Sequence, residues 1–210
     1  TCGCVGSGFV IFKGFLTESE QRRLETQIMP WFNRRDAGGV GGMNQAIRFG
    51  SDMPKWCTEV ADRLRSLDSA THNDDGTGPS LFPRAMLKRE PLFDSLIGNL
   101  YNPGDGIAKH VDLLDRYDDG IISLSFLSHT VMNFERLPIG EHSEESNAHP
   151  VEVWLDPGDL LAFSGDARYK WSHTIPARAA DVLRGEEVER GVRVSITMRK
   201  LINKARFGHD

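Results

Sequence analysis

The chain has 210 residues, of which 39 % are hydrophobic and 26 % are charged, and its net charge is −5 at pH 7. One domain with a sizeable core is expected at this length. The acidic balance excludes a strongly basic footprint over the whole chain. This lowers the expectation of tight, sequence-independent DNA binding but still allows a local basic groove.

The three cysteines, Cys2, Cys4 and Cys57, are too few for a disulfide framework and favour a reducing compartment. No apolar run approaches the length of a membrane span, and no signal peptide is visible at the start. We therefore expect a monomer of the cytoplasm or the nucleus. Cys2 and Cys4 would need two further donors to bind a metal, so a frayed end is the simpler expectation for them.

The first part of the chain predicts one strand and two helices. Thr17 and Glu20 have the spacing of a capping box, which marks the start of a helix. The second helix is indicated by apolar residues at helical spacing. The predicted elements are a strand over Gly8–Phe15, a helix from Thr17 to about Ile28, an irregular stretch over Phe32–Gly50, a helix over Pro54–Leu67 and a polar loop over Ser69–Ser80.

From about Asp94 onward the sequence predicts strands joined by short turns, without helices between them. This arrangement indicates an α+β protein, in which the N-terminal helices pack on an antiparallel jelly roll, a double-stranded β-helix. Residues 1–210 then form one domain, with an N-terminal segment over 1–94 and the jelly-roll core over 95–201. The strands are predicted at Ser95–Asn102, Gly106–Val111, Gly120–Leu127, Thr130–Arg136, Pro150–Leu155, Asp159–Ser164, Tyr169–Ile175 and Gly191–Leu201, with long polar insertions over Arg136–His149 and Ala177–Arg190.

Two His-x-Asp pairs occur in the chain, and only one is predicted to lie on a rigid scaffold. His72 and Asp74 fall in the polar loop, where nothing would hold two metal ligands in place. His110 and Asp112 lie on a predicted strand after a Pro-Gly-Asp-Gly turn, and residues two apart on a strand share a face. With His173 they provide two imidazoles and one carboxylate, which is the ligand set of non-heme Fe(II) oxygenases.

The last predicted strand has an unusual polar face. Arg193, Ser195, Thr197 and Arg199 alternate with apolar residues. Such a face usually points to water, and that interpretation stays open here. If it points into the mouth of the jelly roll instead, two buried arginines require an anionic ligand. A small diacid that also reaches the metal, such as 2-oxoglutarate, meets this requirement.

Asn99 and Tyr101 share a face on the strand before the His110 strand. An amide and a phenol at that place could hydrogen-bond the same carboxylate. An Asn beside a turn and an interfacial Tyr are an equally simple explanation for these two residues.

Taken together, these residues resemble the AlkB family of Fe(II)/2-oxoglutarate dioxygenases, and its eukaryotic homologues in particular. The resemblance extends over roughly Leu96 to Leu201, about half of the chain. The motifs that carry it are Asn99-x-Tyr101, Pro103-Gly104, His110-x-Asp112, Ile122-Ser-Leu-Ser125, Gly165-x-Ala-Arg-Tyr169, Trp171-x-His173 and Arg193-x-Ser-x-Thr-x-Arg199.

The resemblance implies a role for each matching residue. The iron would be bound by His110, Asp112 and His173. The cosubstrate 2-oxoglutarate would be bound by Arg193, Asn99, Tyr101, Ser195 and Arg199, with Arg193 on the distal carboxylate. The N-terminal segment would recognise the substrate, and its basic candidates are Arg34, Arg35 and Arg48.

Two departures weaken the expectation of direct base repair. Ser195 stands where repair enzymes of the family carry Asn, and Leu114 stands where the bacterial enzyme has an acidic residue. The expected reaction is still hydroxylation or oxidative demethylation of a base in DNA, RNA or tRNA, with release of succinate and CO2. An oxidised protein side chain, favoured by the acidic charge, and a non-catalytic jelly-roll binding module are the alternatives.

Overall fold

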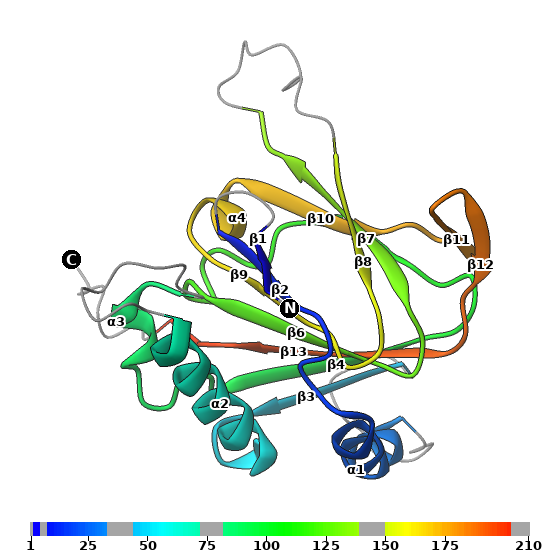
Figure 1. The fold of residues 1–210 in the computed structure, drawn as a ribbon. Helices are drawn as coiled ribbons and strands as arrows, with labels where there is room; N and C mark the ends of the chain where they lie inside the picture. The colour runs from blue at the N-terminus through cyan, green and yellow to red at the C-terminus, as the bar shows by residue number, and fades with distance from the viewer. Residues whose placement is uncertain (1, 5–7, 33–43, 72–81, 139–149, 203–210) are drawn as a thin grey trace.

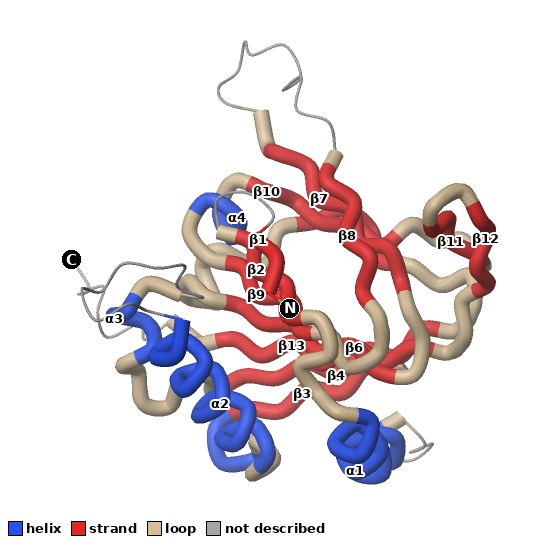
Figure 2. Tube along the Cα trace, viewed as in Figure 1, coloured by secondary structure: helices blue, strands red, loops and turns tan. Residues whose placement is uncertain are grey.

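The computed structural model describes residues 2–4, 8–32, 44–71, 82–138 and 150–202. Two antiparallel sheets face each other and form a jelly roll (Figures 1 and 2). The larger sheet has the order β1-β2-β9-β6-β13-β4-β3 and the smaller one the order β5-β10-β7-β8. The expected fold class is therefore confirmed. Within the described ranges, no helix is long and apolar enough to cross a membrane.

The larger sheet draws its strands from the whole length of the chain, so it forms only when distant segments meet. Its strands are β1 (Cys2–Cys4), β2 (Phe9–Phe12), β3 (Gln45–Phe49), β4 (Ser95–Tyr101), β6 (Ile121–Phe126), β9 (Leu160–Phe163) and β13 (Arg193–Arg199). The smaller sheet consists of β5 (Ile107–His110), β7 (Thr130–Arg136), β8 (Val151–Leu155) and β10 (Trp171–Ile175), and β11 (Ala180–Leu183) pairs with β12 (Glu186–Glu189) as a separate hairpin.

Helices cover the outer face of the larger sheet (Figure 1). They are α1 (Glu18–Ile28), α2 (Trp56–Thr71) and the short α3 (Arg84–Leu87), while α4 (Asp166–Tyr169) precedes β10. The predicted capping box is present: the Glu20 amide donates to Thr17 Oγ1, and the Thr17 amide donates to Glu20 Oε2. The Glu20 carboxylate also accepts from Arg63 of α2 at 2.9 Å, which joins the two helices.

Apolar side chains fill both sides of the larger sheet. On the outer side, Leu124 of β6 and Ile196 of β13 are fully buried beneath the helices. On the inner side, Phe134 and Phe163 close the space between the two sheets. Truncating a fully buried side chain such as Leu124 to Ala would cost about 2–5 kcal/mol of folding free energy.

Five expectations about local structure are wrong. The short helix α4 stands between β9 and β10, where the sequence predicted strands without helices between them. The stretch predicted to be irregular contains β3, which pairs with β4 over its full length. The insertion over Ala177–Arg190 contains the β11–β12 hairpin, and the expected frayed end at Cys2–Cys4 pairs with β2. The second helix continues to Thr71, beyond its expected end and into the segment predicted as a loop. The strand β3 is stabilised by pairing with the distant β4, although its local sequence signal is weak, while β11–β12 and β1–β2 are hairpins formed by neighbouring segments.

Candidate active site

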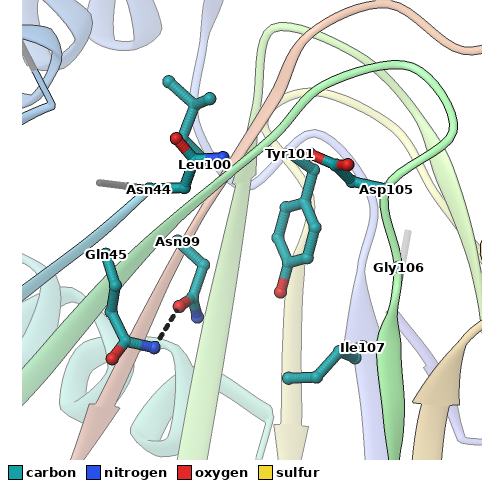
Figure 3. A pocket seen from close by; sticks show the side chains of 8 residues that line it. All are labelled: Asn44, Gln45, Asn99, Leu100, Tyr101, Asp105, Gly106 and Ile107. Atoms are coloured by element: carbon teal, nitrogen blue, oxygen red, sulfur yellow. Dashed lines mark hydrogen bonds between the residues drawn. The ribbon is translucent and has the colours of Figure 1, made fainter. Parts of the chain in front are cut away.

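The inner surface of the jelly roll holds a small cavity of about 40 Å³, and most of its lining residues were singled out in the sequence, but Arg193 is not among them. Three of its lining residues, Asn99, Tyr101 and Ile107, also line a wider groove of about 550 Å³, so the two spaces share a wall (Figure 3). The cavity is lined by Asn99, Tyr101, Ile107, His110, Asp112, Ser123, Met132, Phe163, His173, Ser195, Thr197 and Arg199.

The two histidines of the cavity lie side by side on adjacent strands of the smaller sheet. His110 ends β5 and His173 lies on β10, and the antiparallel register makes them direct partners. Their ring centroids are 4.2 Å apart at an interplanar angle of 55°. Nδ1 of His110 lies 2.8 Å from the carbonyl oxygen of Ala108, which leaves Nε2 available to a metal.

His173 is held in an apolar setting that keeps it neutral. Its ring lies 5.8 Å from the ring of Phe134 and 5.7 Å from that of Phe163. Burial, followed by the nearby His110, lowers the pKa of His173 from 6.5 to about 4. A neutral imidazole at pH 7 is the form that donates a lone pair to a metal.

Asp112 supplies a carboxylate at the same cavity, directly after β5. Its side chain is buried, and Oδ1 lies 2.9 Å from Nη2 of Arg199. No hydrogen bond is made by Oδ2 within the described residues, so one carboxylate oxygen is available. Among these residues, no three His, Cys, Asp or Glu donors already stand together as a metal-binding group. Two facing imidazoles and an adjacent carboxylate are nevertheless donors of the types that suit a non-heme iron.

A buried arginine fixes the backbone around Asp112. Arg168 of α4 donates to the carbonyl oxygens of Asp112 at 3.0 Å, Leu113 at 3.2 Å and Tyr117 at 3.0 Å. It is among the largest fully buried side chains. Its place in the Gly165-x-Ala-Arg-Tyr169 motif was visible in the sequence, but this role was not, because the segment it holds is distant along the chain.

The polar face of β13 points inward. Arg193 and Ser195 are only 2 % and 4 % exposed, so the alternative of a solvent-facing strand surface is wrong. Nη2 of Arg193 donates to Ser125 Oγ at 2.9 Å, and the guanidinium lies 5.4 Å from the centre of the Tyr101 ring. Among the residues that the structure describes, its Nε and Nη1 have no hydrogen-bond partner. Burial lowers the pKa of Arg193 to about 10, which still leaves it charged at neutral pH.

Of the candidates for substrate contact, only Arg48 lies in the described residues, and it does not line this cavity. Arg34 and Arg35 lie outside the described residues, as does the second His-x-Asp pair, His72 and Asp74. Arg48 is three positions from Gln45 on β3, so it points to the opposite face of the sheet. There its guanidinium lies 5.1 Å from the centre of the Trp31 ring.

The comparisons with known proteins agree with this geometry. The family model of the 2OG-Fe(II) oxygenase superfamily matches residues 8–199. The solved structure of OsALKBH1 has a TM-score of 0.65 and 14 % sequence identity, and the match covers 95 % of this chain and all of that one. At this identity the structural likeness supports the fold alone.

Three curated relatives show how far the sequence likeness extends. "Alkylated DNA repair protein ALKBH8 homolog" of Arabidopsis thaliana is 33 % identical over 52 % of this chain and 35 % of its own length. "tRNA (carboxymethyluridine(34)-5-O)-methyltransferase alkbh8" of Xenopus tropicalis is 38 % identical over 50 % of this chain and 15 % of its own length. "Alpha-ketoglutarate-dependent dioxygenase alkB homolog 7, mitochondrial" of Bos taurus is 26 % identical over 91 % and 78 %. The chain thus spans well under half of the first two relatives.

Proposed function

Because this chain belongs to the 2OG-Fe(II) oxygenase superfamily, we propose that it uses Fe(II), 2-oxoglutarate and O2 to oxidise a nucleic-acid base. When bound, the iron and 2-oxoglutarate supply the oxidising chemistry: O2 converts 2-oxoglutarate to succinate and CO2, and one oxygen atom enters a C–H bond of the substrate. If that carbon is an N-methyl group, the hydroxymethyl product breaks down to formaldehyde and the demethylated base.

The single observation that carries the proposal is the buried guanidinium of Arg193. A charged group with two unpaired N–H donors is costly in a protein interior. A carboxylate placed against Nη1 and the second N–H of Nη2, which share one edge of the guanidinium, would accept two parallel hydrogen bonds, the preferred geometry of an arginine–carboxylate pair. The distal carboxylate of 2-oxoglutarate would meet this need, while its other end would reach the histidines that share the cavity with Tyr101.

The residues around the metal position would set the orientation and the protonation of the metal-binding atoms. His110 would present Nε2, because Nδ1 is engaged with the Ala108 carbonyl. His173 would bind without first losing a proton. Arg199 would orient Asp112 through the Oδ1 contact, and would support the metal-proximal end of the cosubstrate. Phe134 and Phe163 would keep water away from this side of the cavity.

The nucleic-acid part of the proposal is supported by the relatives. The Arabidopsis protein is named for the repair of alkylated DNA and the Xenopus protein for a modified uridine of tRNA. Oxidation of a base inside a duplex would require that the base is flipped out of the stack or is already single-stranded. A protein side chain is the second candidate for the substrate, and the net charge of −5 favours it.

A turnover screen tests the proposal directly. Purified protein with Fe(II) and 2-oxoglutarate is offered methylated oligonucleotides, tRNA and methylated peptides, and succinate and substrate mass are followed. Substrate-dependent succinate release with an oligonucleotide or tRNA, and none with peptides, is the expected result. Oxidation of peptides alone would reverse the choice of substrate. A protein that binds neither Fe(II) nor 2-oxoglutarate would refute the proposal and leave the non-catalytic binding module.

A further inference from the structure

A row of polar residues crosses four neighbouring strands of the larger sheet and ends at Ser125, which accepts a hydrogen bond from Arg193. Gln45 of β3 is the register partner of Asn99 of β4, and Asn99 is in turn the partner of Ser195 of β13. Ser195 pairs with Ser125 of β6, whose Oγ accepts the hydrogen bond from Arg193. Register partners on adjacent strands point to the same face, so the row lies on one face of the sheet, where Asn99 and Ser195 line the cavity.

The outermost member of this row controls the orientation of the next one. Nε2 of Gln45 donates to Oδ1 of Asn99 at 2.8 Å, as Figure 3 shows. An amide has one acceptor side and one donor side, so this bond directs the Nδ2 donor of Asn99 away from Gln45. Within the described residues Nδ2 has no partner. Asn99 lines both the groove, with Gln45, and the inner cavity, with Ser195.

We propose that Gln45 is a positioning residue for the cosubstrate, acting through Asn99. A carboxylate can only accept hydrogen bonds, so it interacts favourably with Nδ2 of Asn99 and unfavourably with Oδ1. By occupying Oδ1, Gln45 ensures that Asn99 presents N–H to the 2-oxoglutarate carboxylate. This inference rests on the proposed function, because it assumes that 2-oxoglutarate is the ligand of the cavity.

A double-mutant cycle separates an action through Asn99 from a direct one. The variants are Gln45→Met, which keeps the length of the side chain without a donor, Asn99→Ala, and the two combined. The dissociation constant of 2-oxoglutarate is measured by calorimetry on the Mn(II)-loaded protein. This measurement does not depend on turnover. We expect Gln45→Met to weaken binding by about three- to tenfold, which corresponds to one ordinary hydrogen bond. In the Asn99→Ala background the same change should have no further effect.

A variant that reverses the direction of the hydrogen bond between residues 45 and 99 sharpens the test. The carboxylate of a Gln45→Glu variant would accept from Nδ2 of Asn99, so Oδ1 would turn toward the cosubstrate. Asn44→Asp is the matched control, since it adds the same charge to the same groove at a residue outside the row. We expect Gln45→Glu to bind 2-oxoglutarate more weakly than both Gln45→Met and the control.

The possible outcomes are distinct. Unchanged affinity in Gln45→Met or Gln45→Glu would overturn the role of Gln45, as would an equal loss from Gln45→Met with and without Asn99. Gln45 is exposed on an edge strand, so thermal unfolding of these variants should match the wild type, and a fall in affinity then reflects positioning. If the wild-type protein itself fails to bind 2-oxoglutarate, the proposed function fails rather than this inference alone.

Discussion

At the scale of single residues, Arg193 is the position where ligand binding and folding stability oppose each other. Its pKa, lowered by burial from 12.5 to about 10, implies a penalty on the order of 3 kcal/mol for holding the charge inside the ligand-free protein. An Arg193→Met variant should therefore unfold at a higher urea concentration without ligand. The same variant should lose 2-oxoglutarate affinity by on the order of a hundredfold, because the paired hydrogen bonds are gone.

Two further variants complete this experiment. Arg193→Lys should restore little affinity, since an ammonium cannot form two parallel hydrogen bonds with one carboxylate. Arg22→Ala on the exposed face of α1 is the control and should change neither the urea concentration of unfolding nor the affinity for 2-oxoglutarate. Unchanged 2-oxoglutarate binding in Arg193→Met would contradict the assigned role of this guanidinium.

The three proposed iron ligands make a second prediction at this scale. His110→Ala, Asp112→Ala and His173→Ala should each abolish succinate formation and bound iron, because each removes one donor of three. The far-ultraviolet circular dichroism should be retained, since all three ligands line a cavity, although His173 also lies against Phe134 and Phe163. His72→Ala, in the other His-x-Asp pair, should behave as the wild type. Iron loss in that variant would reverse the choice between the two pairs.

At the scale of elements, one buried carboxylate joins the β11–β12 hairpin to the smaller sheet. Asp181 is fully buried and accepts from Arg190 at 2.7 Å, from Arg178 at 2.8 Å and from the Val131 amide of β7 at 3.0 Å. Burial alone would raise the pKa of Asp181, but these hydrogen bonds outweigh it and lower the pKa below 3.8.

Asp181→Asn should cost about 3–5 kcal/mol in the free energy of unfolding at pH 7, because buried Arg190 loses its partner. A carboxyl with a lowered folded-state pKa contributes its stability above pH 3.8 and loses it as the pH falls through the lower value. The difference between variant and wild type should thus shrink in acid. The exposed Asp166–Lys170 pair is the control, and Asp166→Asn should cost less than 1 kcal/mol. Equal urea midpoints for the two variants would rule out the anchoring role.

The strands of the jelly roll could be predicted where they carry a regular alternation, as β13 does. The inward direction of its polar face was harder, because alternation fixes which residues share a face but not which face is buried. The edge strand β3 and the hairpin could not be predicted. They lie in Gly-rich or charged stretches and depend on β4 and on the ion pairs of Asp181. The roles of Arg168 and Gln45 were missed for the same reason, since each acts on residues far away in sequence.

At the scale of the whole molecule, an acidic chain that binds nucleic acid must rely on a local basic surface. Arg34 and Arg35 are the sequence-based candidates for this surface. If they contact phosphates, neutralising both should weaken oligonucleotide binding and reduce the dependence of log affinity on log salt by about one unit for each lost contact. Binding titrations at two salt concentrations measure this slope, and turnover of 2-oxoglutarate without substrate should stay the same. An unchanged slope would favour a protein substrate.

The facing histidines also have a consequence for how the protein matures. His110 and His173 lie on β5 and β10, which are neighbours in the sheet although β6, β7, β8 and β9 separate them along the chain. Contacts of this range form late in folding, because the long loop must close first. In a stopped-flow refolding experiment, helical signal from α1 and α2 should therefore precede the capacity to bind Co(II). A nascent chain released before β10 would remain unable to capture a metal ion.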